Sequence, residues 1–351
     1  MKRTQYITPS RAIFWLFVAL AAWFLAHRFG QIQTATNTLL AGSLLWIIVA
    51  AILQAIYYYC LTMLSILSFK IVGIKRTVSG LLPLILGSLV INVLAPSGGA
   101  AGAGLFMQDA SARKESVAKT GSAALLALLG TYFSFIPILA AGVIFLISQH
   151  EIRVYQIAGS LVLILLIGAI YLAFRLATQR KSVLRHLFHG VDRVASAINW
   201  TLRRTKPILK KGWIDEVMAE LAEAGEAVHS RPKLVQKALQ FGLLGYLINI
   251  LSLAAIFLAF HQQLNVGIII AGYAISFLFW IVAPAPQGIG IEEAIMSLVL
   301  GSLGLPAAQS IAIAVAFRGV NFWLPMLVGI VLYARHQHQS TTLQNEYNPN
   351  N

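Results

Sequence analysis

The chain has 351 residues, of which 58% are hydrophobic and only 11% are charged. Soluble globular domains are about half apolar and about a quarter charged, so this composition excludes an ordinary soluble domain. Several apolar stretches reach the roughly 18 or more residues that a membrane-spanning helix needs. The net charge of +14 therefore indicates basic loops that face anionic lipid headgroups, and not a protein that binds nucleic acid.

The apolar segments predict an all-α, polytopic membrane protein. The first segment follows Lys2, Arg3 and Arg11 as a signal peptide would, but no small-residue cleavage site follows it, so we interpret it as a retained helix. A proline at position 137 predicts a kink within the third. We expect six full crossings, at residues 12–27, 39–65, 120–147, 154–174, 238–260 and 308–333.

Two further apolar segments are interrupted by prolines and glycines. The first break reads VLAPSGGAAGAG at residues 93–104, and the second reads IVAPAPQGIGIEE at residues 281–293. Backbone this irregular is tolerated at membrane depth only where it is buried in protein or lines a water-filled cavity. We therefore expect each segment to turn back as a re-entrant hairpin, at about 78–118 and about 266–304.

The basic residues sort cleanly to one side if both hairpins turn back. The cytoplasmic side then receives the N-terminal basic residues, the clusters at 70–76 and 113–119, and a long basic loop at about 178–237. The outer side keeps only Arg28 and Arg153, in agreement with the positive-inside rule. This arrangement predicts a multi-pass protein of the cell (inner) membrane, with both termini in the cytoplasm.

The same arrangement predicts an inverted repeat. Residues 1–147 and 154–333 each contain two crossings, a hairpin and a third crossing, so the second half begins on the opposite face. The first hairpin then enters from the cytoplasm and the second from outside. Broken helices that meet near the midplane of an inverted repeat are the sequence sign of a transporter site. Residues 334–351 are expected to form a disordered tail.

Arg318 is the most informative single residue, because a charge at the centre of a membrane helix costs about 2.5–3.5 kcal/mol on insertion scales. Glu292 and Glu293, just past the second break, are its expected partners. Two interpretations stay open: a buried ion pair that only fixes the hairpin, or a guanidinium that binds a lipid phosphate. Asn321 lies one turn further along and would share the face of Arg318.

The breaks themselves supply further candidate contacts to a headgroup, because unpaired N–H groups at the start of a helix attract anions. Close packing of helices through small residues is the alternative for most of the glycines. Asn92 and Asn249 are expected to form hydrogen bonds between helices, and Asp109 lies either in the first hairpin or at the surface. The candidate contacts at the breaks are Ser97, Gly98, Gly99, Pro284, Pro286, Gly288 and Gly290.

The sequence indicates no catalytic residues, metal site or cofactor. His186 and His189 have helical spacing but lie among arginines, which favours a solvated role over metal binding. The glycine-rich break lacks the preceding strand and the Gly-Lys-Ser of a P-loop. Cys60 is the single cysteine, so no disulfide framework is possible within the chain.

Two long motifs resemble a known family. APAPQGIGIEEAI and AFRGVNFWLPMLVGI resemble the C-terminal signature of the lysylphosphatidylglycerol synthase transmembrane region, also called the flippase-like or UPF0104 family. LAPSGGAAGAG resembles the N-terminal hairpin of that family, and the resemblance covers about residues 13–333. It implies a region that moves aminoacylated phosphatidylglycerol between leaflets, beside a separate cytosolic domain that performs the aminoacyl transfer. The residues that match the family pattern are Pro284, Pro286, Gly288, Gly290, Arg318 and one of Glu292 and Glu293.

The favoured function is a flippase-like lipid transporter, and not an enzyme, that moves an anionic or modified phospholipid or a lipid-linked headgroup between leaflets. No ATPase motif is visible, so an ion gradient or the lipid gradient would have to drive active transport. Membrane phospholipids are the expected partners, with a homo-oligomer or a separate lipid-modifying enzyme as further candidates.

Two alternative functions remain open. A phosphatidylglycerol lysyltransferase-type subunit requires a large cytosolic transferase domain, for which the polar segment after residue 333 is expected to be too short. A membrane assembly partner without transport predicts no cavity between the two hairpins.

Overall fold

The computed structural model describes residues 41–94, 100–150, 225–282 and 286–334, together with positions 161, 165, 168 and 172. The regular structure of these residues is helical, and four helices are long and apolar enough to cross a membrane: residues 44–71, 119–148, 232–259 and 307–334. The expected all-α membrane class is confirmed. The first predicted crossing, nearly all of the fourth, most of the basic loop and the tail lie outside the described residues.

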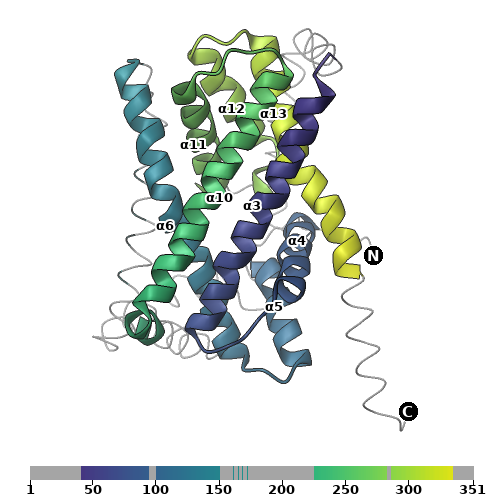
Figure 1. Ribbon diagram of the computed structural model, residues 1–351, viewed down its shortest axis with the longest axis vertical. Helices are drawn as coiled ribbons and strands as arrows, with labels where there is room; N and C mark the ends of the chain where they lie inside the picture. The colour runs from purple at the N-terminus through teal and green to yellow at the C-terminus, as the bar shows by residue number, and fades with distance from the viewer. Residues whose placement is uncertain are drawn as a thin grey trace, which may run out of the picture.

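Three long helices form the frame of the molecule: α3 (Leu44–Ile71), α6 (Val117–Ser148) and α10 (Pro232–Ala259). Helix α10 packs along α3, and both contact α6 (Figure 1). Local sequence sets two of their starts. Pro232 occupies the first turn of α10, where its missing N–H costs nothing, and the Ser116 hydroxyl caps α6 by accepting the Lys119 N–H at 3.3 Å.

Small residues let these helices approach closely. A Cβ added to Gly242 of α10 would lie 2.2 Å from Ser134 Oγ of α6, and one on Gly245 would lie 3.3 Å from Cys60 Cβ of α3. Ser252 Oγ of α10 donates to the Ala50 carbonyl of α3 at 3.0 Å. Association in lipid depends on such contacts, because lipid tails are as apolar as the side chains they would replace.

Two pairs of shorter helices pack against this frame. Helices α4 (Val78–Leu94) and α5 (Ala100–Ala112) contact each other, and so do α11 (Val266–Val282) and α12 (Ile291–Ser302). In Figure 1 the first pair lies in the lower half of the molecule and the second in the upper half. The 17 residues of α4 or of α11 span about 25 Å, which is less than the ~30 Å hydrocarbon core.

The expected interhelical hydrogen bonds of both asparagines are confirmed. Asn92 Oδ1 of α4 accepts the Gly102 N–H of α5 at 2.8 Å, which ties the two helices together near their break. Asn249 Nδ2 of α10 donates to the Tyr273 hydroxyl of α11 at 3.1 Å, within an aromatic core that also includes Phe277.

The last span is not a continuous α-helix. Helix α13 (Ala307–Arg318) passes directly into a π-helical turn, η2 (Gly319–Trp323), before regular helix resumes up to residue 334. The span at 307–334 agrees with the crossing predicted at 308–333, but the sequence analysis did not predict the π turn. Single π turns inside α-helices are frequent at functional sites, and this one begins immediately after Arg318.

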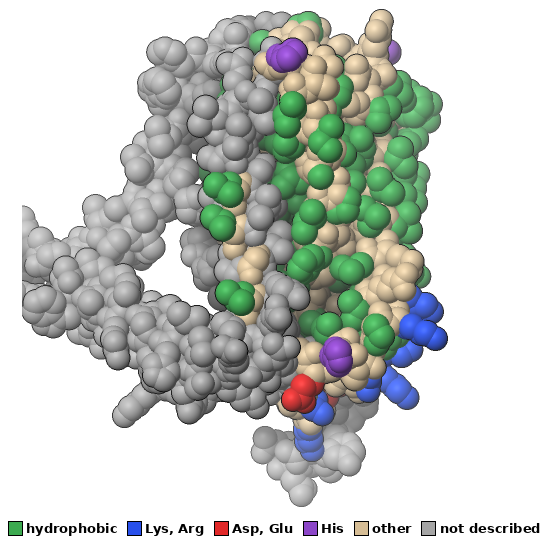
Figure 2. All heavy atoms as spheres, turned by 90° about the vertical axis from the view of Figure 1, so that its left-hand side faces the viewer, with side chains coloured by type: hydrophobic (Ala, Val, Ile, Leu, Met, Phe, Trp, Pro, Cys, Tyr) green, Lys and Arg blue, Asp and Glu red, His purple; other side chains and the backbone are tan. Residues whose placement is uncertain are grey.

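The basic side chains gather at one end of the molecule. Figure 2 shows Lys and Arg atoms at the lower end of the face it views, below a broad band of hydrophobic side chains. That end is where α3 finishes and where α4, α6 and α10 begin (Figure 1). Among the described residues, the Lys and Arg at that end are Lys70, Lys75, Arg76, Arg113, Lys114, Lys119, Arg231, Lys233 and Lys237, and Arg318 is the exception.

Cysteine labelling tests how the two ends of the molecule face the membrane. We expect Ser111→Cys, at the basic end, and Ala307→Cys, at the opposite end, to react with a membrane-impermeant maleimide from opposite sides of intact vesicles. Both positions are exposed, and a Cys60→Ala background removes the buried native thiol. Labelling of both positions from the same side would contradict the opposed entry of the two short helix pairs.

Candidate functional site

Arg318 lies near the middle of its span. It follows Ala307 by 11 residues and precedes Ala334 by 16, within a membrane-length helix of 28 residues. At 1.5 Å per residue its Cα is about 16 Å from one end of the span and about 24 Å from the other. Its side chain is only 4% exposed, so its charge must be compensated inside the protein.

The guanidinium is surrounded on three edges and one face. Nη1 donates to Glu292 Oε2, and Nη2 donates to the backbone carbonyl of Gln287. Nε lies 3.2 Å from Glu293 Oε1, and the Phe322 ring centroid is 4.2 Å from Cζ. The arginine therefore pairs with both adjacent carboxylates and stacks on an aromatic ring supplied by the π turn.

The second break holds the partners of Arg318 in place. Between α11 and α12, a short 3-10 turn, η1 (Pro286–Gly288), contains Gln287 at φ 53° and ψ 23°, a left-handed conformation that non-glycine residues adopt at a cost of about 1–2 kcal/mol. This conformation turns the Gln287 carbonyl toward Arg318. Glu293 Oε2 then accepts the Gly290 N–H at 2.8 Å, which caps the start of α12.

Glycine is required at position 288 for two reasons. Its φ is +63°, and an added Cβ would lie 2.6 Å from Cδ1 and 3.3 Å from Cα of Trp280. Gly290, at φ +82°, starts α12, so both predicted glycines shape the turn that carries the glutamates. Pro286 begins η1, whereas Pro284 lies outside the described residues.

Helix α3 completes the site from the other side. Gln54 Nε2 donates to Asn321 Oδ1 at 2.9 Å, and the Tyr58 hydroxyl donates to the Asn321 carbonyl at 3.2 Å. Asn321 thus joins the π turn to α3. Sequence reasoning had not singled out Gln54 or Tyr58. A glutamine in the middle of an apolar crossing was the available signal for the first, but a tyrosine there is equally typical of a packed core.

These residues form one polar group near the middle of the bundle, which we call the Arg318 cluster. Two of its buried acceptors, Gln54 Oε1 and Gln287 Oε1, have no hydrogen-bond partner within the described part of the chain. With one guanidinium and two carboxylates, its formal charge is −1. The cluster comprises Arg318, Glu292, Glu293, Gln287, Asn321, Gln54 and Tyr58.

The first broken segment reaches the second. Helix α4 contacts η1, and a Cβ on Gly87 of α4 would lie 3.0 Å from the Tyr333 ring near the end of the last span. The predicted contacts Ser97, Gly98 and Gly99 lie outside the described residues, so their role stays a prediction.

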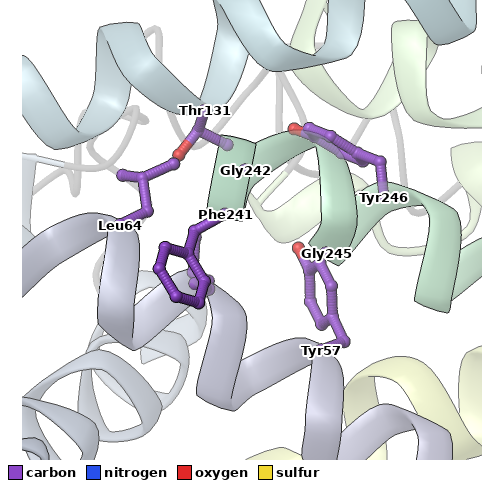
Figure 3. Close-up of a pocket in the computed structure, with 8 residues that line it drawn as sticks. Tyr57, Leu64, Thr131, Phe241, Gly242, Gly245 and Tyr246 are labelled. Carbon is purple, nitrogen blue, oxygen red and sulfur yellow. The ribbon is translucent and has the colours of Figure 1, made fainter. Parts of the chain in front are cut away.

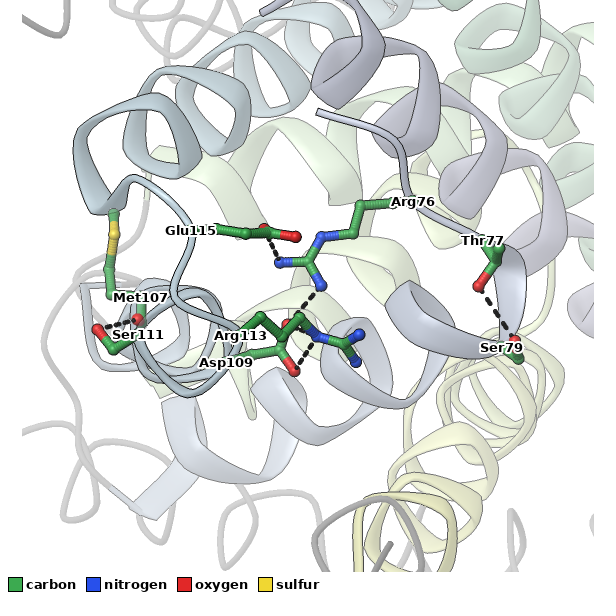
Figure 4. Close-up of polar contacts among 8 residues, drawn as sticks. All are labelled: Arg76, Thr77, Ser79, Met107, Asp109, Ser111, Arg113 and Glu115. Carbon is green, nitrogen blue, oxygen red and sulfur yellow. Dashed lines mark hydrogen bonds and ion pairs between the residues drawn. The ribbon is translucent and has the colours of Figure 1, made fainter. Parts of the chain in front are cut away.

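A second buried arginine cluster lies at the basic end of the molecule (Figure 4). Arg76, between α3 and α4, donates through Nη1 to Asp109 and through Nη2 to Glu115, each at 2.7 Å. Arg113 Nε lies 3.0 Å from Asp109 Oδ2, which balances the two carboxylates with two guanidinium groups.

The Arg76 cluster was missed by sequence reasoning. The sequence placed Arg76 in a basic cluster on the cytoplasmic side, yet its side chain is 4% exposed and that of Asp109 is 8% exposed. The spacing of Asp109 and Arg113 by four residues was the available signal for a helical ion pair. Because the cluster is electrically balanced and joins α3, α5 and α6 at their ends, we interpret it as structural.

A small pocket lies apart from both arginine clusters (Figure 3). Helices α3, α6 and α10 line it, and its volume of about 10 Å³ leaves room for about one water molecule. It cannot hold a lipid headgroup, and it shares no residue with the Arg318 cluster. The lining residues are Tyr57, Leu61, Leu64, Thr131, Phe241, Gly242, Gly245 and Tyr246.

Comparison with known proteins decides the family. The family model described as "Lysylphosphatidylglycerol synthase TM region" matches residues 11–329. The chain belongs to this family. A relative called "UPF0104 membrane protein", from Methanothermobacter thermautotrophicus, is 23% identical over 322 residues, covering 89% of this chain and 91% of the relative. The resemblance drawn from the sequence motifs is confirmed, and the matched region contains the entire Arg318 cluster.

Removal of the central guanidinium should strongly destabilise the protein. We expect Arg318→Ala to lower the free energy of unfolding by about 3–5 kcal/mol, because it leaves two buried carboxylates without a cation. Arg318→Lys should cost less, since it keeps the charge but loses the fork that reaches three acceptors. Thermal unfolding of the purified protein in detergent measures both. Equal stability of Arg318→Ala and the parent protein would contradict the buried ion pair.

Two glycines provide a matched pair that separates backbone strain from steric overlap. Gly288 and Gly304 both have positive φ, but an added Cβ at Gly304 meets open space. We expect Gly288→Ala to lower the free energy of unfolding by about 1–3 kcal/mol more than Gly304→Ala, because overpacking against Trp280 adds to a similar backbone cost. The same unfolding measurement applies, and equal losses would show that the break tolerates a side chain.

Proposed function

We propose that this protein moves a phospholipid with an anionic phosphate headgroup between the leaflets of the cell membrane. The observation that carries the proposal is the Arg318 cluster, a buried guanidinium with two carboxylates and unpaired amide oxygens near the middle of a membrane span. Ionisable residues at this depth mark substrate or ion pathways more often than they serve packing. The family model supports the same region as a membrane unit.

The proposal includes a topology. The basic end of the molecule faces the cytoplasm, in keeping with the positive-inside rule, and both termini lie on that side. The pair α4 and α5 enters the membrane from the cytoplasm and turns back, and the pair α11 and α12 does so from outside. The contact of α4 with η1 supports a meeting of the two breaks inside the bundle. Broken helices in an inverted repeat are a recurrent design for alternating access in transporters.

The chemistry of the cluster suits a phosphate. The planar fork of Arg318 matches a phosphate in the same bidentate manner as a carboxylate, and α12 begins beside it with the positive end of its dipole. Nη1 and Nη2 of Arg318 both donate within the protein, and Nε forms an ion pair with Glu293 without a hydrogen bond. In the proposed mechanism a phosphate oxygen displaces one of the carboxylates, and the cluster is a closed state of the proposed site.

We propose further that this membrane region acts on lipids without catalysing a reaction. Phospholipids are its ligands, and any lipid-modifying enzyme works as a separate partner. The relative's printed name and the family description speak of a membrane protein and of a synthase membrane region, which supports neither a transferase activity of these helices nor a purely structural role.

Reconstitution tests the function directly. We expect the purified protein in liposomes to speed the exchange of fluorescent phosphatidylglycerol between leaflets, measured by its protection from a membrane-impermeant quencher. Arg318→Lys, which keeps the charge but loses the fork, should lower the rate per folded protein at least about tenfold, as loss of a bidentate contact predicts. Glu292→Ala/Glu293→Ala should also lower the rate, because no carboxylate is left to take the guanidinium back and release the phosphate.

Arg76→Ala is the matched control. Arg76 is buried to the same 4%, and it also contacts two carboxylates, so its loss costs stability in the same way. The rate of lipid exchange per folded Arg76→Ala protein should stay within about twofold of the parent rate, because the Arg76 cluster is not part of the proposed site. Equal losses in the Arg318 and Arg76 variants would reduce the site to a structural role. Exchange no faster than in protein-free liposomes would reject lipid movement.

A further inference from the structure

The formal charge of the Arg318 cluster poses a problem for any anionic ligand. The charged groups that face Glu292 among the described residues are Arg318 and Glu293, so the cluster holds one negative charge in excess. The other titratable groups around it are the neutral hydroxyls of Tyr57 and Tyr58 on α3 and of Tyr273 on α11. An anion that enters this site places a second negative charge at a depth where water does not screen it.

The two carboxylates of the cluster are not equivalent. Glu293 accepts the Gly290 N–H at 2.8 Å and is 19% exposed, so it keeps a hydrogen bond and some hydration without Arg318. Glu292 is 4% exposed, and the bond that it accepts comes from Arg318 Nη1. If Nη1 turns to another acceptor, Glu292 is left as a buried and unpaired anion, which is the more costly state.

We propose that Glu292 takes up one proton when a phosphodiester anion binds Arg318. The proton comes from water and binds a carboxylate oxygen of Glu292, while Arg318 stays charged and its Nη1 bond passes from Glu292 to a phosphate oxygen. The cluster then holds the same total charge before and after loading. Coupling of this proton to lipid movement rests on the proposed function. Proton uptake on binding does not depend on lipid movement.

The surroundings of Glu292 support this exchange. Glu293 keeps its contacts with Gly290 and Arg318 Nε, so the start of α12 remains fixed while Glu292 changes partner. Gln54 is 1% exposed, and its Oε1 has no hydrogen-bond partner in the described part of the chain. Gln287 Oε1 is likewise buried and unpaired. Both oxygens are unpaired acceptors within the Arg318 cluster.

Proton uptake on binding is the decisive measurement. The full-length protein in detergent and weak buffer at pH 7 is titrated with dihexanoylphosphatidylglycerol, and the pH change and the bound lipid are measured together. We expect about one proton per bound lipid. Glu292→Gln, which mimics the protonated group, should bind without uptake, and Glu115→Gln, which lies in the Arg76 cluster outside the proposed site, should retain the uptake as the control.

A second probe identifies the recognised group. Glycerophosphoglycerol carries the same phosphodiester without acyl chains, so uptake with both probes assigns recognition to the phosphodiester, and uptake with the lipid alone assigns it to a lipid headgroup. Either result supports the exchange. Binding of lipid by the parent protein without proton uptake overturns it, as does failure of both probes to bind, or uptake that survives in Glu292→Gln.

Transport separates this inference from the function on which its coupling rests. In liposomes with a gradient of one pH unit, coupling of one proton to one anionic lipid predicts up to a tenfold asymmetry of fluorescent phosphatidylglycerol between leaflets, and none in Glu292→Gln. Lipid exchange that ignores the gradient overturns the coupling and leaves the proposed function standing. One proton taken up per bound lipid without any lipid exchange supports the binding step and rejects the proposed function.

Discussion

A guanidinium buried near the middle of a membrane-spanning helix must find its counter-charges inside the protein, and this requirement organises the second half of the chain. Arg318 reaches two carboxylates and a backbone carbonyl, and all three are supplied by the break between α11 and α12. An unbroken helix there could not present the Gln287 carbonyl, because the backbone carbonyls of a regular helix pair with its own N–H groups. The break is thus the means by which a lipid-embedded segment offers acceptors to an arginine on another helix. The left-handed Gln287 and the steric exclusion of a side chain at Gly288 are local costs of that arrangement.

The two arginine clusters make similar contacts in different surroundings. Arg76 and Arg318 are equally buried, and each contacts two carboxylates and lies near a phenylalanine ring. At Arg76 a second arginine balances the charge, and the cluster lies at the end of the molecule where the loops meet. At Arg318 one carboxylate remains in excess near the centre of the span. A charge-balanced cluster at the end of the bundle favours a fixed structural contact. An unbalanced charge near the middle of a membrane span favours a site whose residues exchange partners with a ligand.

Much of the fold could be predicted because membrane-spanning helices can be recognised from the length and the apolar content of their sequence segments. α4 and α11 begin where the two hairpins were predicted to begin, α12 ends within two residues of the predicted end of the second hairpin, and the prolines and glycines located the second break. The pairing of Arg318 with the glutamates followed from the cost of an unpaired charge. The π turn after Arg318 could not be predicted, because GVNFW has no composition that distinguishes it from α-helix. The roles of Gln54, Tyr58 and Arg76 depend on which helices face one another, and a single sequence holds that information only weakly.

The π turn η2 connects Arg318 to helix α3. Within this turn, Phe322 stacks on the guanidinium of Arg318. Asn321 of the same turn points toward α3, where it forms hydrogen bonds with Gln54 and Tyr58. Arg318 is therefore held between a fixed side, formed by η2, α3 and Glu293, and an exchangeable side, formed by Glu292. A ligand that competes for the exchangeable side meets an arginine that is already oriented, and this lowers the entropic cost of binding. The same geometry makes the release of Glu292, and not the movement of Arg318, the step that opens the site.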